Sequence, residues 1–262
     1  MIMNLPADGR RPAEYPFYSQ WESPELVPSF LDGSLTAEQD PRWHCSGAAS
    51  PAEYAYWAVK TCGLACLKMI LAARGEPVPP TMRLVGRALD WQAFVPIPGT
   101  SRVHGLIYRP FTDWVKADYG IAAEVAPELT ADGLAGRLAG GAVVIASVHP
   151  WVRWPDRVPP DRGGHLVLVT GRDGGQLILN NPSGLPGISQ HAARIALTVF
   201  ARFYAGRGIV IAPPAPGRAP PGWGRGDREV SPGRMDPGRQ HKEAGREHAA
   251  ELDRGRLRRA GP

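Results

Sequence analysis

Residues 61–75 read TCGLACLKMILAARG, and this stretch guides the interpretation of the whole chain. Thr61 is a suitable N-cap, the apolar residues fall on one face, and Gly75 is a C-terminal stop, so the pattern predicts a helix. Cys62 would lie in its first turn, where unpaired N–H groups and the helix dipole lower the pKa of a thiol. Cys62 is therefore a candidate nucleophile, the alternative being a buried structural cysteine. Cys66 lies one turn further and is interpreted as structural.

The remaining pattern predicts helices first and strands later. Further helices are expected at 81–89, 110–119 and 130–139, and strands at 142–148, 165–170, 176–180 and 208–211. A turn at 172–175 joins two of these strands as a hairpin, and the last strand closes the sheet. Residues 1–60 are punctuated by Pro and Trp, which predicts loops and short pieces. This order indicates an α+β fold, with N-terminal helices packed on an antiparallel sheet.

Two polar residues of the predicted hairpin are candidates for chemistry. His165 opens a strand directly after two glycines, so a sheet would hold its ring rigidly, as a general base requires. Asn181 follows 16 residues later, where its amide oxygen can reach Nδ1 of His165 and fix the tautomer. The alternatives are a surface or capping histidine and an ordinary turn at 180–184. Asn180 is the second choice for the orienting amide.

The order Cys, His, Asn is that of the papain-type triad. The stretch 61–71 resembles the active-site helix of the C39 and C39-like cysteine peptidases. GHLVLVTG at 164–171 resembles the histidine strand of that family, and Asn-Pro at 181–182 resembles its Asp-Pro motif. YPFYSQ at 15–20 is similar to the Val-Pro-Tyr-x-Ser-Gln segment of the C39-like branch.

The resemblance implies a papain-like fold and assigns a role to each candidate. Cys62 would be the nucleophile, His165 the base and Asn181 the residue that orients the imidazole. Gln20 would form the oxyanion hole together with the Cys62 backbone N–H. The chain departs from the family at two positions, because Tyr56 stands where transporter-fused members have a glutamine and Asn181 stands where an aspartate is usual.

Substrate contacts are predicted at four further residues. Gly63 would let a substrate backbone approach the nucleophile. Trp151, Arg153 and Trp154 follow a predicted strand and would line a substrate groove, the alternative being a loop packed on the sheet. His149 competes as the base, but it precedes a proline in an irregular loop. A zinc site would have to combine two neighbouring residues of the N-terminal segment with two cysteines of the predicted helix. The spacing of these four residues does not match that of structural zinc sites, so no metal is predicted. The residues in question are His44, Cys45, Cys62 and Cys66.

Composition divides the chain near residue 213. The net charge is +5, but residues 213–262 carry +4 of it and contain 8 Pro and 9 Gly, with few apolar residues. We predict a folded domain at 1–212 and a disordered tail at 213–262. The folded part is thus nearly neutral, which removes the main argument for nucleic-acid binding.

These observations predict a peptidase that acts on a peptide or small protein without a cofactor. The alternatives are an acyl or amide transferase on the same scaffold and a non-catalytic peptide-binding module. The chain has no signal-like start and no apolar run near 18 residues, so a cytoplasmic protein without membrane association is expected. Three cysteines do not form a disulfide framework, which agrees with that expectation. The oligomeric state is not predicted.

Overall fold

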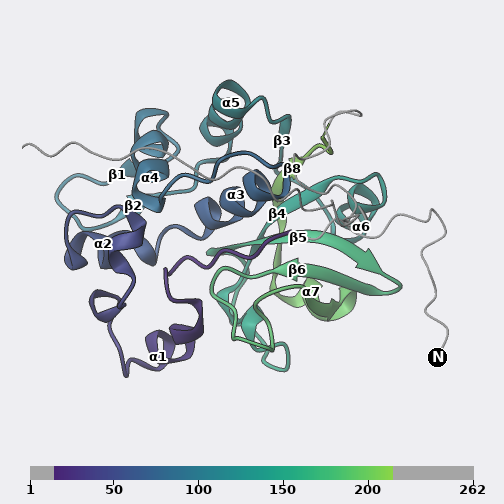
Figure 1. The fold of residues 1–262 in the computed structure, drawn as a ribbon. Coiled ribbons are helices and arrows are strands. Elements are labelled where there is room, and N and C mark those ends of the chain that lie inside the picture. Colours follow the sequence, from purple (N-terminus) through teal and green to yellow (C-terminus); the bar gives the residue numbers. More distant parts are fainter. Residues whose placement is uncertain (1–14, 215–262) are drawn as a thin grey trace, which may run out of the picture. The chain divides into compact units, whose positions relative to one another are not determined.

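A computed structural model describes residues 15–214 of the chain and has the predicted α+β organisation (Figure 1). Its main sheet is antiparallel throughout, with the strand order β3-β8-β4-β5-β6-β7. The strands of this sheet are β3 (Ala123–Ala126), β4 (Val143–Val148), β5 (His165–Asp173), β6 (Gln176–Asn180), β7 (Ala193–Ala196) and β8 (Tyr204–Ile211). A separate small hairpin pairs β1 (Val95–Pro96) with β2 (Val103–His104).

Helices cover both faces of the sheet. The helices are α1 (Val27–Asp32), α2 (Pro51–Ala58), α3 (Cys62–Ala73), α4 (Thr81–Asp90), α5 (Tyr108–Tyr119), α6 (Ala131–Ala139) and α7 (Leu197–Phe203). Val143 and Ile145 of β4 pack into a core with α3, α4 and α5, whereas Val144 and Ala146 pack into a second core with α6 and α7. This alternation follows from the two-residue period of a strand. A strand buried on both faces explains why 142–148 is uniformly apolar.

The predicted elements around the sheet are confirmed to within a few residues, and several others were missed. The first 60 residues contain α1 and α2, where only loops and short pieces were expected. The signal for α2 was present, because Ser50 accepts a hydrogen bond from the Glu53 N–H and Pro51 occupies the first helical position. The strand that was expected to close the sheet, β8, instead lies inside it, between β3 and β4.

Thr61, the residue before α3, connects the start of this helix to two other segments. Thr61 is the N-cap residue of α3, as predicted, but its side chain makes no capping hydrogen bond. Its hydroxyl instead donates to the carbonyl of Ala58 at 3.2 Å and approaches that of Gln20 at 3.5 Å. These contacts bring the segment around Gln20 to the start of α3, although 41 residues separate the two positions.

No single helix within residues 15–214 has both the length and the apolar composition needed to cross a membrane. The pair α2 and α3 passes that test together, by length and composition only, and is bent by 88°. Most of the predicted tail, from residue 215 onward, lies outside the described residues.

Candidate active site

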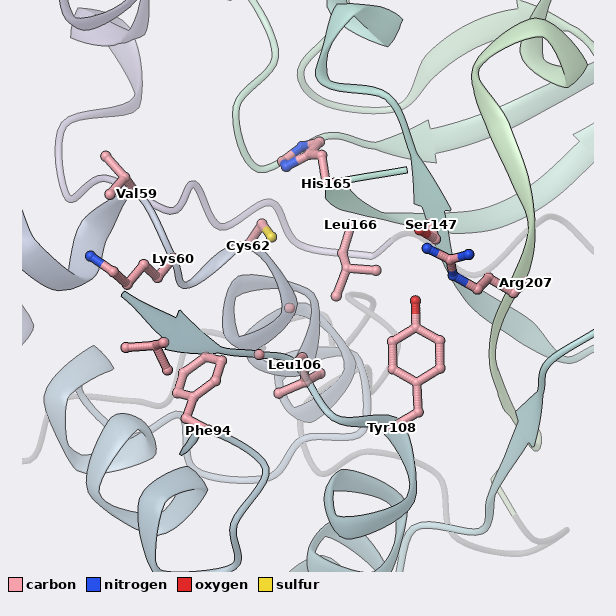
Figure 2. A pocket seen from close by; sticks show the side chains of 14 residues that line it. Val59, Lys60, Cys62, Phe94, Leu106, Tyr108, Ser147, His165, Leu166 and Arg207 are labelled. Carbon is pink, nitrogen blue, oxygen red and sulfur yellow. The ribbon is translucent and has the colours of Figure 1, made fainter. Parts of the chain in front are cut away.

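A pocket of about 540 Å³ opens at the first turn of α3. Cys62 and His165 both line it, and Figure 2 shows the two side chains in the same view of its wall. Its lining residues come from α3 and the turn before it, from β4, β5 and β8, from the start of α5, and from the segments around the small hairpin. They are Val59, Lys60, Cys62, Gly63, Phe94, Val103, Gly105, Leu106, Tyr108, Ser147, Gly164, His165, Leu166 and Arg207.

The sheet fixes the position of His165. It is the first residue of β5 and pairs with Val148 of β4. The two residues before it, Gly163 and Gly164, have φ angles of +97° and +89°, a region that glycine adopts without a steric penalty. The glycine pair therefore turns the chain sharply into β5 and leaves the histidine at the pocket wall.

The imidazole of His165 is held by Asn181, as predicted, but through the other ring nitrogen. Nε2 of His165 lies 2.8 Å from Oδ1 of Asn181, so the expectation of a bond to Nδ1 is wrong. Because an amide oxygen only accepts, Nε2 carries the hydrogen and Nδ1 keeps a lone pair. Asn181 is itself fixed, since its backbone N–H donates to Gln190 and its Oδ1 also accepts from the Ser183 N–H. The arrangement leaves Nδ1 as the nitrogen that can accept a proton.

A serine and an arginine that sequence reasoning did not connect lie behind the histidine. Oγ of Ser183 is 3.0 Å from Nε2 of His165, and Nη2 of Arg153 donates to that oxygen at 2.8 Å. Arg153 was predicted to line a substrate groove, but it is buried and does not line the pocket of Cys62 and His165, and neither do Trp151 and Trp154. Arg153 belongs instead to the hydrogen-bonded surroundings of the imidazole.

Burial favours the neutral forms of both reactive groups. Burial lowers the pKa of His165 to about 4, the bond to Asn181 acts in the opposite direction, and the positive charge of Arg153 lowers it further. Burial also raises the pKa of the Cys62 thiol, although backbone hydrogen bonds around Leu166 and Gly63 partly oppose this. The prediction of a lowered thiol pKa is therefore wrong, because desolvation outweighs the helix N-terminus. At neutral pH the pair is a thiol and an imidazole.

Gln20 lies against the loop that carries Asn181. Its backbone N–H donates to the carbonyl of Pro182 at 3.0 Å, and the hydroxyl of Ser19 donates to the same oxygen at 2.8 Å. The Gln20 side chain is buried, yet its Oε1 has no hydrogen-bond partner within residues 15–214. A buried amide oxygen normally has a hydrogen-bond partner, but this oxygen can only accept, and Gln20 is not among the residues that line the pocket of Cys62 and His165. The assignment of Gln20 to the oxyanion hole therefore stays a prediction.

Asn180 and His149, the alternatives to Asn181 and His165, make their hydrogen bonds elsewhere in the fold. Asn180 donates to the carbonyl of Tyr15 and accepts from the Ala192 N–H, which engages both ends of its amide. His149 accepts from the Trp151 N–H and contacts Asp161 at 3.3 Å, outside the pocket. Asn181, not Asn180, is therefore the amide at the histidine.

Gly63 lies at the pocket, but its small size serves packing as well as access. A Cβ at this position would lie 2.9 Å from the side chains of both Leu106 and Leu166. Of the cysteines, Cys66 is fully buried with its sulfur 3.9 Å from the Leu166 carbonyl, and Cys45 is exposed. Within residues 15–214, no group of three or more His, Cys, Asp or Glu side chains is placed to hold a metal ion.

Comparison with known proteins gives structural similarity only. No protein-family model matches the chain, and no curated protein matches it. The chain is similar to the peptidase domain of Streptococcus ComA, a bifunctional ABC transporter of a quorum-sensing pathway, at 17% identity and a TM-score of 0.40. The match covers 59% of this chain and 92% of that one. A Bacillus anthracis structure described as a C39-like peptidase matches at 13% identity and a TM-score of 0.43, covering 58% and 88%.

Proposed function

We propose that this protein is a C39-like cysteine peptidase that hydrolyses a peptide bond of a peptide or small protein. The single observation that carries the proposal is the bond between Nε2 of His165 and Asn181 at 2.8 Å, in a histidine that shares its pocket with Cys62. That bond leaves Nδ1 as a base, and the pocket supplies a thiol at a helix start. Nucleophile, base and orienting amide are the three components of a papain-type triad.

The neutral state of the pair defines the first chemical step. Nδ1 of His165 accepts the thiol proton as the Cys62 sulfur forms a bond to the substrate carbonyl carbon, so no ion pair needs to exist beforehand. The carbonyl electron pair moves to oxygen, where the Gln20 amide and the Cys62 N–H donate hydrogen bonds to it. When the intermediate collapses, the C–N bond breaks and the imidazolium gives its proton to the leaving amine.

The second step releases the acyl group from sulfur. A water molecule loses its proton to His165 and attacks the thioester, the C–S bond breaks, and the thiol of Cys62 is restored. An amine in place of the water would make the same scaffold an acyltransferase. The acceptor therefore separates hydrolysis from transfer, and the residues of the triad are the same for both.

The test is mass spectrometry of a peptide library incubated with the full chain and with Cys62→Ala. We expect the wild-type chain to produce pairs of fragments whose masses add up to that of the parent peptide plus one water. Cys62→Ala should produce no such fragments. Products of a mass that corresponds to an added amine would indicate transfer. Unchanged peptides with the wild-type chain, or equal cleavage by Cys62→Ala, would contradict the proposal.

A further inference from the structure

The charged side chains that line the pocket are all positive. Two of its lining side chains, Lys60 and Arg207, are cationic, and none is an Asp or a Glu. Lys60 is already engaged, because its Nζ donates to the Tyr56 carbonyl and lies 3.7 Å from the centre of the Tyr56 ring. Arg207 is exposed at β8 and belongs to none of the ion pairs between the described residues. The pocket thus offers a guanidinium without an acidic partner.

The guanidinium of Arg207 lies close to the backbone that leads into His165. A Cβ built on Gly163 would lie 3.2 Å from Nη2 of Arg207 and 3.4 Å from Oγ of Ser147. Both donors therefore converge on the backbone two residues before His165. Ser147 is buried on β4 and pairs with Leu166, the next residue of β5. The convergence depends on the missing side chain at Gly163, whose φ of +97° also favours glycine.

A third donor completes the cluster. Tyr108, at the start of α5, points its hydroxyl towards Arg207 and Ser147 in Figure 2. Burial raises the pKa of this hydroxyl, while Ser147 and the charge of Arg207 oppose the rise. The phenol therefore stays protonated at neutral pH and can donate. A planar guanidinium flanked by two hydroxyl groups suits a planar, doubly accepting anion.

We propose that Arg207, Tyr108 and Ser147 form a carboxylate-binding subsite of this pocket. The subsite deepens the proposed function and rests on it, since it defines the substrate as a peptide with a carboxylate near the bond that is cleaved. A sphere of the pocket's volume is about 10 Å across, the length of about three extended residues. The carboxylate therefore lies within about two residues of the reacting carbonyl. It comes from an Asp or Glu side chain or from the C-terminus of the peptide.

The experiment measures binding separately from cleavage. Hexapeptides with Asp or Glu at each position, and the same peptides with Asn or Gln, are made with a free or an amidated C-terminus. Their affinity for the full chain carrying Cys62→Ala is measured by fluorescence anisotropy. We expect the acid-containing peptides to bind about tenfold more tightly than their neutral counterparts, the effect of one charge-assisted hydrogen-bonded pair. A difference between the Asp or Glu peptides and their Asn or Gln counterparts indicates a side-chain carboxylate. A difference between free and amidated peptides indicates the C-terminal carboxylate.

Variants in the same background assign the effect to the subsite. Arg207→Gln should abolish the preference, and Arg207→Lys should keep part of it because the charge remains. Arg172→Gln is the matched control, since Arg172 is also exposed but lies outside the pocket, and it should leave the preference intact. Equal binding of acidic and neutral peptides, or a preference that survives Arg207→Gln, would overturn the subsite. A preference that depends on Arg207, in a chain that cleaves nothing, would leave the subsite standing and contradict the proposed peptidase.

Discussion

Replacing Arg153 by Met should raise the pKa of the candidate base. Arg153 is buried, takes part in none of the ion pairs between the described residues, and reaches His165 only through the hydroxyl of Ser183. Its charge therefore disfavours protonation of the imidazole without a nearby carboxylate to offset it. Methionine is unbranched and apolar, so it replaces the stem of the arginine side chain and removes the charge.

The size of the effect follows from the geometry. The contacts of 2.8 Å and 3.0 Å to the shared hydroxyl place the guanidinium nitrogen within about 6 Å of Nε2 of His165. At an effective dielectric constant of about 20, two unit charges about 6 Å apart repel by about 3 kcal/mol. Burial and Asn181 affect this pKa more than Arg153 does. We therefore expect the variant's pKa to rise by about 1–2 from the wild-type value of about 4, and to remain below the ordinary 6.5.

The assay is an NMR titration of the imidazole signals in the full chain. The chain has seven histidines, and His165→Gln identifies the signal of interest by its disappearance. Arg153→Lys is the control, because it keeps the positive charge and should leave the pKa near the wild-type value. A pKa that is unchanged or lower in Arg153→Met, in a variant with a wild-type melting curve, would refute the proposed electrostatic coupling.

Two further predictions concern stability. Because the folded-state pKa of His165 lies near 4 and the ordinary value is 6.5, stability is full above pH 6.5 and falls as the pH drops towards 4, by about 3 kcal/mol. Urea unfolding at pH 7 and pH 4 should show this loss in the wild type and a smaller one in His165→Gln; equal losses would contradict it. Gly63→Ala should lower stability by about 1–3 kcal/mol, because its Cβ would lie 2.9 Å from two leucine side chains. Gly86→Ala, in a helix with open space around it, should be neutral or stabilising in the same thermal melt, and an equal loss in both would contradict the packing argument.

The elements that carry the reactive residues were predictable because their signals are local. The helix after Thr61 ends before Gly75, and the strand after Gly164 is a continuous apolar run, so both were located within a few residues. The hairpin then placed Asn181 at His165 from connectivity alone. In contrast, α2 lies in a stretch where frequent prolines predict loops, although proline is favoured at the first helical position, which Pro51 occupies.

Properties that depend on tertiary packing were not predictable. Which ring nitrogen of His165 faces Asn181 depends on how the loop after β6 returns to β5, not on the spacing of the two residues. The direction of the Cys62 pKa depends on whether burial or the helix N-terminus dominates, and burial is absent from a sequence. Arg153 meets Ser183 across 30 residues, and Arg207 approaches Gly163 across a longer gap. No local pattern connects either pair.

The most direct test of the account is site-resolved labelling of the full chain with a thiol-reactive activity-based probe, read by peptide mass spectrometry. Exposed Cys45 and buried Cys66 serve as internal references for an ordinary and an inaccessible thiol. If Cys62 is a nucleophile activated by His165, it should be labelled much faster than Cys45 in the wild type, and His165→Ala should remove that advantage. Labelling confined to Cys45, or labelling of Cys62 at the same rate with and without His165, would contradict the account.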